Sequence, residues 1–130
     1  MEIKPIVLLS EYQILRDLIK RNTDQRVAKE VQQLSSELDR AIVIKEEEIN
    51  EKIVRIGSEV EIEEMKSKRT MKVRLVLPTE ANLAQGKVSL LAPLGVALIG
   101  FSEGDEVNWE MPAGTTQIRI LKVNNEDLDA

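Results

Sequence analysis

The segment spanning residues 87–123 constrains the fold more than any other part of the chain, because residues that end or redirect the backbone divide it into short pieces. Proline favours the first turn of a helix, and glycine favours the position just after the last turn. A β-forming run occupies residues 87–91, and Pro93 and Gly100 then flank a small apolar helix. Gly104-Asp105 precedes a strand at 106–111, and Pro112-Ala113-Gly114 precedes a strand at 115–123. The segment therefore predicts three strands and one short helix.

Two further strands are expected upstream of this segment. Residues 58–65 place Val60 and Ile62 alternately with glutamates, and residues 71–77 continue the alternation after a basic turn at 66–69. Alternate residues of a strand point to opposite faces, so each strand has one apolar face for a core and one polar face for water. The glutamates are expected to form a solvated face, because carboxylates spread along a flat strand do not wrap around a calcium ion.

The N-terminal third carries two helical patterns. Ser10 is expected to cap a first helix of about a dozen residues, which would be about 18 Å long. Residues 21–24 interrupt the pattern, and a second helix follows. Its apolar positions alternate steps of four and three along a narrow seam, at Val27, Val31, Leu34, Leu38 and Ala41. Two helices joined by a short turn predict an antiparallel hairpin.

Together these patterns predict an α+β fold. A short antiparallel helical hairpin is expected in residues 1–48, followed in residues 49–130 by an antiparallel β-sheet domain with one short helix. The acidic stretch Lys45-Glu46-Glu47-Glu48 is expected to be a solvated connector near the boundary. Residues 124–130 are polar and acidic, and we expect them to fray.

The composition argues against an autonomous enzyme and against direct nucleic-acid binding. The chain has no cysteine and no histidine, which removes the commonest metal ligands and the commonest general base at neutral pH. A net charge of −5 disfavours contacts to phosphates. With one Trp, one Tyr and one Phe, the chain also lacks stacking platforms for bases. We therefore expect no cofactor, no metal and no sequence-specific nucleic-acid partner.

The chain is expected to act in the cytoplasm. The apolar run at residues 5–9 is too short for a secretory signal or a membrane span, because polar residues follow it at once. The absence of cysteine agrees with a reducing compartment. We expect no membrane partner.

The sequence KVSLLAPLGVALIGFSEGDEVNWEMPAGTTQIRILKV (residues 87–123) resembles the C-terminal domain of the Gre transcript-cleavage factors. LSSELDRA (34–41) and VNWEMPAG (107–114) are more similar to one branch of that superfamily, the regulator of nucleoside diphosphate kinase. That branch pairs a shortened helical hairpin with the same C-terminal domain. The resemblance covers residues 10–123 and implies that the sheet is FKBP-like and that the partner is RNA polymerase.

The resemblance also implies a docking site. The Gre C-terminal domain contacts a polymerase subunit through a strand-to-helix edge, and the matching residues here are Ser89, Leu91, Ala92, Pro93 and Leu94. An exposed proline bordered by aliphatic residues would be a rigid anchor. The alternative is that Pro93 only begins a helix and Leu91 fills the core. For Trp109 we expect core packing, with ligand stacking as the alternative.

Asp24 lies in the turn between the two helices. In the cleavage factors that this chain resembles, acidic residues in this turn enter the secondary channel of the polymerase and help to hold a catalytic magnesium ion. Here the turn offers Asp24 alone, between Arg21 and Arg26. We expect Asp24 to cap the second helix at the tip of the hairpin and not to bind a metal.

The function expected from the sequence is transcription regulation without enzymatic activity. The protein would bind RNA polymerase at the entrance of the secondary channel and would stimulate transcript cleavage weakly. Two alternatives stay open. One is a true cleavage factor with Asp24 as a metal ligand, and the other is an FKBP-like protein-binding module unrelated to polymerase. Prolyl isomerase activity is not expected, because three scattered aromatic residues cannot line the pocket that it needs.

Overall fold

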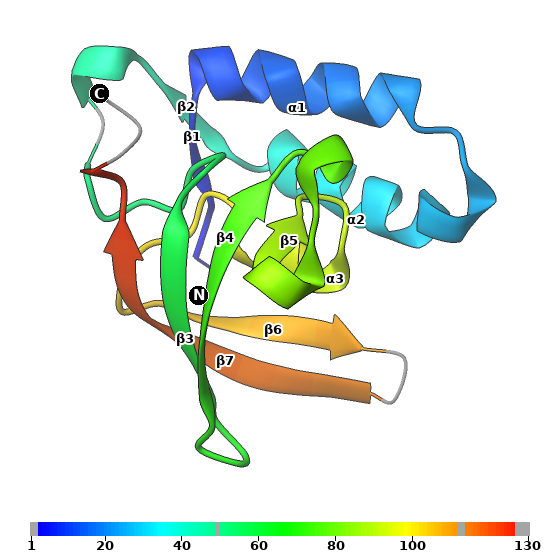
Figure 1. The fold of residues 1–130 in the computed structure, drawn as a ribbon. Helices are drawn as coiled ribbons and strands as arrows, with labels where there is room; N and C mark the ends of the chain where they lie inside the picture. Colours follow the sequence, from blue (N-terminus) through cyan, green and yellow to red (C-terminus); the bar gives the residue numbers. More distant parts are fainter. Residues whose placement is uncertain (1–2, 49, 112–113, 127–130) are drawn as a thin grey trace.

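A curled five-stranded β-sheet forms the larger part of the molecule (Figure 1). The computed structural model describes residues 3–48, 50–111 and 114–126. Across the sheet the strand order is β5-β4-β3-β7-β6. The strands are β3 (Glu59–Glu64), β4 (Thr70–Val76), β5 (Lys87–Ser89), β6 (Glu106–Met111) and β7 (Gly114–Asn124). With the helices described below, the fold is α+β, as the sequence predicts.

The alternation predicted for β3 is confirmed, whereas in β4 it holds only in the middle of the strand, since Met71 is exposed and Val76 is buried. Val60 and Ile62 are fully buried on one face of β3. On the other face, each glutamate lies opposite a cation of a neighbouring strand: Glu59 opposite Arg74, Glu61 opposite Lys72, and Glu63 opposite Arg119. Cross-strand pairs of opposite charge stabilise a sheet. The glutamates therefore belong to a mixed charge ladder on the outer face.

One strand runs in a direction that the sequence did not predict. We expected an antiparallel sheet, but β5 pairs with β4 in parallel, with Val88 opposite Leu75. Between them the chain makes two 3₁₀ turns, Pro78–Glu80 and Leu83–Gln85. A parallel pair needs such a crossover, whereas an antiparallel pair can use a tight turn. Turn residues mark where a strand ends but do not report the direction of the next one.

The helix α3 (Pro93–Leu98) follows β5 and contacts β5 and β6. Pro93 occupies its first turn, and Gly100 follows its end with a left-handed φ of 84°. Both predicted roles are confirmed. Gly95 lies so close to β5 that a Cβ there would come within 2.2 Å of the backbone oxygen of Ser89. The strand-to-helix turn therefore depends on a glycine at this position.

Two longer helices lie across one end of the sheet. After α1 (Leu9–Arg21) the chain passes through a 3₁₀ turn (Gln25–Val27) and returns as α2 (Ala28–Asp39) (Figure 1). Arg16 of α1 donates a hydrogen bond to the Ser35 hydroxyl of α2 (3.1 Å) and forms an ion pair with Asp39. No helix among the described residues is long and apolar enough to span a membrane.

Our expectation that Ser10 caps α1 is wrong. The helix begins at Leu9, and the residue at the capping position is Leu8, whose side chain makes no cap hydrogen bond. The physical reason is a strand that the sequence did not reveal: β1 (Ile6–Leu8) continues directly into the helix. Ser10 lies in the first helical turn.

The strand β1 pairs in parallel with β2 (Ile42–Ile44), which follows α2. This two-stranded sheet joins the segments that enter and leave the helices. It is tied to the rest of the molecule by a hydrogen bond from the Ile6 amide to the Gly100 carbonyl (2.8 Å). Runs of three residues are too short to show alternation, which explains why neither strand was predicted.

A single hydrophobic core extends from the sheet into the helices. The helical residues in it are Leu15, Leu34 and Leu38, which are at most 3% exposed. They share the core with the apolar faces of α3 and the sheet. The boundary that we placed between residues 48 and 49 stays a prediction, since the packing is continuous across it.

The C-terminal tail is more ordered than we expected. Asn124 pairs with Glu59 at the end of β7, and Asn125 is buried. The Asn125 amide donates to the carbonyls of Glu51 (2.7 Å) and Ile53 (2.8 Å), and its oxygen accepts a hydrogen bond from the Ser58 hydroxyl. The predicted fraying is therefore wrong for these two asparagines. Residues 127–130 and the predicted turn at Pro112-Ala113 lie outside the described residues.

Candidate docking groove and helix tip

An apolar groove lies between β4, the start of α3 and β6. Its volume is about 560 Å³, and its wall includes Met71, Leu83, Val88, Pro93, Leu94 and Trp109. Leu83 is 82% exposed and Met71 is 46% exposed. Clustered exposure of large apolar side chains is typical of a surface that binds a ligand or another protein. We call this surface the docking groove.

Three of the five predicted docking residues lie in this groove. Ala92, Pro93 and Leu94 line it, and the first two are partly exposed. Ser89 and Leu91 do not line it. The Ser89 hydroxyl accepts a hydrogen bond from the Leu91 amide (3.0 Å), and Leu91 is 4% exposed within the core. These two residues hold the strand-to-helix turn that presents Pro93.

A second hollow of about 370 Å³ continues from the docking groove toward the turn between β3 and β4. Ile62, Glu64, Ser67 and Arg69 line it, and it shares Met71 and Trp109 with the groove. Trp109 packs against the core as we expected, yet it is only partly buried and borders both hollows. The two hollows therefore form one surface with an apolar and a polar end.

The turn between β3 and β4 is organised by one carboxylate. Glu64 accepts hydrogen bonds from the amides of Lys66 (2.8 Å) and Ser67 (3.0 Å) and from the hydroxyl of Thr116 on β7. These hydrogen bonds, the one from Thr116 first, lower the pKa of Glu64 from 4.5 to about 2. Lys68 takes a left-handed φ of 62° at the apex.

Asp24 caps the 3₁₀ turn that precedes α2. One of its carboxylate oxygens accepts a hydrogen bond from the Arg26 amide (2.9 Å). We expected Asp24 to cap the second helix itself, but the residue at the cap position of α2 is Val27, because the 3₁₀ turn lies between Asp24 and the helix. The Arg26 guanidinium also contacts both oxygens, at 2.7 Å from Nη2 to Oδ2 and 3.2 Å from Nε to Oδ1. The Arg26 side chain is the main reason why the pKa of Asp24 falls from 3.8 to about 2. The carboxylate is thus already engaged.

A buried ion pair fixes α1 to the sheet. The Glu11 carboxylate accepts hydrogen bonds from Arg55 Nε (2.9 Å) and from the Ile56 amide (3.0 Å). The two side chains are 11% and 13% exposed. Because an unpaired charge at such a site is costly, the pair specifies where the first helix lies.

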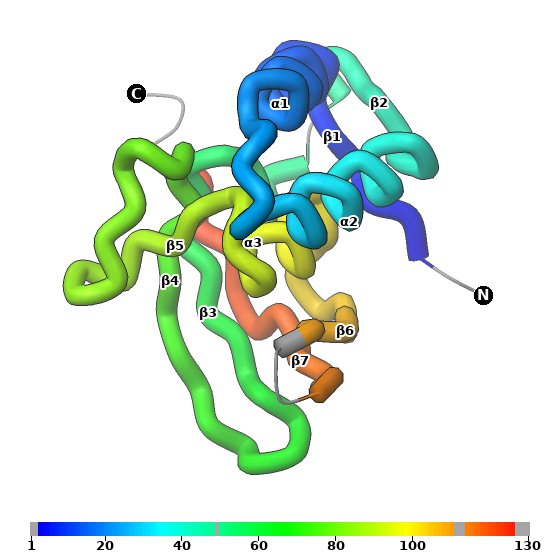
Figure 2. The backbone as a smooth tube through the Cα atoms, turned by 90° about the vertical axis from the view of Figure 1, so that its right-hand side faces the viewer, coloured from blue at the N-terminus to red at the C-terminus, as the bar shows by residue number. Residues whose placement is uncertain are grey.

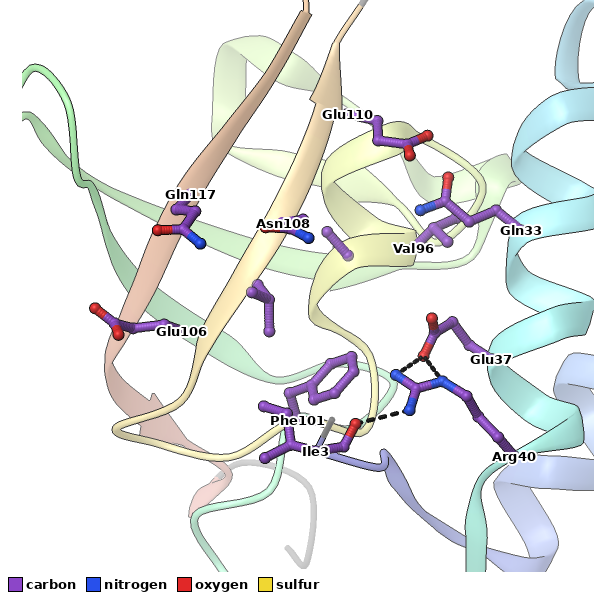
Figure 3. A pocket seen from close by; sticks show the side chains of 12 residues that line it. Ile3, Gln33, Glu37, Arg40, Val96, Phe101, Glu106, Asn108, Glu110 and Gln117 are labelled. Atoms are coloured by element: carbon purple, nitrogen blue, oxygen red, sulfur yellow. Dashed lines mark hydrogen bonds and ion pairs between the residues drawn. The ribbon is translucent and has the colours of Figure 1, made fainter. Parts of the chain in front are cut away.

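A polar cavity of about 370 Å³ separates α2 from β6 (Figure 3). On its wall Arg40 pairs with Glu37 (2.8 Å) and donates to the Ile3 carbonyl (2.8 Å). Within the described part of the chain, no buried side-chain nitrogen or oxygen lacks a hydrogen-bond partner. Of the charged groups that line this cavity, Glu37 and Arg40 pair with each other, and Glu106 pairs with Arg119.

Metal binding finds no support in the side-chain arrangement. Among residues 3–48, 50–111 and 114–126, no three acidic side chains come together in a way that could hold an ion. At the tip, the neighbouring acid Asp17 pairs with Arg21 (2.9 Å) on the same helix.

Sequence reasoning missed the most exposed part of the docking groove. Leu83 and Met71 were not predicted as contact residues. One signal was available, since Leu83 is a lone large apolar residue in the polar loop TEANLAQGK. Met71 lies near the start of β4, and its exposure in the groove depends on the strand order, which the sequence does not reveal.

Comparisons with known proteins agree on one family. A family model described as "Transcription elongation factor, GreA/GreB, C-term" matches residues 49–125. Transcription elongation factor GreA of Alkaliphilus oremlandii is 35% identical over 103 residues, covering 79% of this chain. Regulator of nucleoside diphosphate kinase of Escherichia coli K12 is 32% identical over 91 residues, covering 69% of this chain and 67% of that protein.

A solved structure extends the similarity to the whole fold. The transcription elongation factor GreA/GreB from Nitrosomonas europaea superposes with a TM-score of 0.74 at 30% identity, covering 95% of this chain and 99% of that one. The match to Alkaliphilus oremlandii GreA spans only 65% of that protein's length.

Proposed function

The chain belongs to the GreA/GreB family of transcription elongation factors, and from that premise we propose that it is a transcription regulator that binds RNA polymerase. The sheet, FKBP-like in this proposal, docks on the polymerase surface through the docking groove. The two helices form a short prong at the entrance of the secondary channel. The protein acts in the cytoplasm, by occupancy and without catalysis or a cofactor.

The docking groove is the observation that carries this proposal. The segment that the family resemblance assigns to polymerase contact, Ala92 to Leu94, forms part of its wall. Geometry independently marks the same place, because Leu83 and Met71 expose apolar surface there. A hydrophobic patch centred on a rigid proline suits a protein partner, since little conformational entropy is lost on binding.

Weak stimulation of transcript cleavage is the second part of the proposal. With 13 residues, α1 is about 20 Å long, and its buried face is held in the core by Leu15 and by Glu11. A magnesium ion delivered to a distant reaction centre needs free carboxylate oxygens and a long reach. Asp24 has its oxygens engaged with Arg26. These features favour a blocking role at the channel entrance.

Two alternative functions, a cleavage factor and a protein-binding module unrelated to polymerase, are each supported by one feature of the structure. Asp24 is exposed at the tip, where a cleavage factor would need a metal ligand. The docking groove would also serve a protein-binding module whose partner is not polymerase. The experiments below separate all three.

The first experiment measures binding to purified core RNA polymerase and displacement of a full-length cleavage factor. We expect binding by the wild type and about a tenfold loss for Leu83→Asp, because an apolar contact would be replaced by a charge. Leu9→Asp is the matched control: Leu9 is 48% exposed in the first turn of α1, where an acid is tolerated. Failure of the wild type to bind would rule out polymerase as the partner.

The second experiment measures transcript shortening in backtracked elongation complexes. We expect little shortening by the wild type and inhibition of an added cleavage factor. Asp24→Ala should leave both results unchanged. Strong shortening that is abolished by Asp24→Ala would replace the proposal with the cleavage-factor alternative.

A further inference from the structure

The β3–β4 turn carries a cluster of positive charge on an acidic protein. Lys66, Lys68 and Arg69 are exposed at this turn. In the part of the chain that the structure describes, no salt bridge reaches any of the three. Elsewhere cations are mostly matched by acids, as on the outer face of β3, and the net charge is −5. We call these three side chains the basic tip; they form a cluster of neighbouring cations without a salt bridge among the described residues.

The basic tip has a defined shape. Besides the amide hydrogen bonds to the Glu64 side chain, the Lys68 amide donates to the Glu64 carbonyl (2.8 Å), and the Glu64 amide donates to the Arg69 carbonyl (2.8 Å). The tip is also braced from β7 by Thr116. It lies at the end of the molecule remote from α1, as the two views of the backbone show (Figures 1 and 2).

The basic tip is continuous with the docking groove. Arg69 lines the second hollow together with Met71 and Trp109, and these two residues also line the groove. A chain segment that lies in the groove and continues past Trp109 therefore reaches Arg69, and beyond it the rest of the tip. The surface changes from apolar to cationic along this direction.

We propose that the docking groove and the basic tip together bind one acidic amphipathic segment of the polymerase, with apolar side chains in the groove and carboxylates against Lys66, Lys68 and Arg69. This inference rests on the proposed function and adds the chemistry and orientation of the bound segment. The apolar contacts supply most of the affinity. The charged contacts fix which end of the segment lies at Arg69 and increase the rate of encounter.

A nucleic-acid strand is a poorer occupant of this surface. A phosphate backbone is held by a track of cations, and the groove wall offers only Lys72, which already lies 3.9 Å from the Glu59 carboxylate. Trp109 is the only aromatic residue on the wall, so successive bases could not stack. The change from apolar to cationic surface fits a polypeptide with apolar side chains at one end and acidic side chains at the other.

The test compares two charge-neutralised proteins for binding to core polymerase free of nucleic acid. The first combines Lys66→Gln, Lys68→Asn and Arg69→Gln; asparagine is chosen because it tolerates the left-handed backbone at position 68. The control changes three exposed cations away from the groove, Lys4, Lys45 and Lys122, to glutamine. Both lose the same charge. We expect about a tenfold weaker affinity and a smaller salt dependence for the tip variant, and near wild-type values for the control.

The outcomes of this binding experiment distinguish the inference from the proposed function. Equal binding by the tip variant and the wild type, with Leu83→Asp still impaired, would overturn this inference and leave the proposed function standing. Equal weakening of both neutralised proteins would also overturn it, because net charge alone would then explain the effect. A loss seen only in elongation complexes would assign the tip to phosphates. No binding by the wild type would overturn both proposals.

Discussion

The carboxylate of Glu11 and the guanidinium of Arg55 lie 2.9 Å apart at the junction of α1 with the sheet domain, and both side chains are nearly inaccessible to water. The same carboxylate accepts a hydrogen bond from the Ile56 amide. The Glu11 carboxylate therefore helps, together with apolar packing, to fix where α1 lies.

Replacing Glu11 by alanine should destabilise the fold by about 3 kcal/mol, because the buried Arg55 guanidinium would lose its ion pair with Glu11 and the Ile56 amide would lose its acceptor. Urea denaturation followed by circular dichroism measures this difference. Asp17→Ala is the control, since Asp17 forms an exposed i,i+4 pair with Arg21 and should change the unfolding free energy by less than about 1 kcal/mol. Equal effects of the two substitutions would contradict a special role for the buried pair.

Asn125→Ala should cost about 2 kcal/mol of unfolding free energy, because the buried Ile53 carbonyl, the Glu51 carbonyl and the Ser58 hydroxyl would each lose a hydrogen bond. A thermal melt or urea titration checks the value. Glu126→Ala, one residue further along and exposed, should have no measurable effect. A similar cost for both residues would show that the tail contributes as a whole and not through Asn125.

Gly95→Ala should destabilise the protein by at least about 2 kcal/mol, because its Cβ would collide with the backbone oxygen of Ser89. Gly104→Ala separates this effect from backbone strain: φ is 94° there, but nothing lies within 4 Å of the added carbon. Its expected cost is about 1 kcal/mol. If Gly95→Ala proves the milder change, the close approach of α3 to β5 is not essential.

The order of the basic tip should depend on pH in an acidic window. Since the pKa of Glu64 is lowered from 4.5 to about 2, its contribution is complete above pH 4.5 and is lost as the pH falls toward 2. NMR shifts of the Lys66 and Ser67 amides should follow this titration. In Glu64→Gln both amides should resemble the acidic form already at neutral pH. A titration midpoint near 4.5 in the wild type would contradict the hydrogen-bonded geometry.

The sequence predicted those parts of the fold whose signals are local. The alternation of Val60 and Ile62, Pro93 at the start of α3 and Gly100 at its end each report on their immediate neighbours, and all were correct. Pairings between distant segments were missed. The parallel direction of β5 is one case, and the burial of Asn125 against residues 51–58 is another. Such contacts leave no periodic trace in the sequence.

The sequence predicted one part of the candidate site and missed the rest. The resemblance directed attention to residues 89–94, and three of those line the groove. The groove itself depends on Leu83, Met71 and Trp109, which come from three separate elements. Only the folded arrangement brings these side chains to one surface and joins them to Arg69.

The parallel pairing of β1 with β2 holds both ends of the helical segment, residues 9–39, in one short ladder. The ladder is in turn hydrogen-bonded, through the Ile6 amide, to the carbonyl of Gly100, which follows the end of α3. Both helices are therefore anchored at the same place. Because both ends of the helical segment are held in this ladder, the segment cannot swing away as a whole without breaking backbone hydrogen bonds beside Gly100.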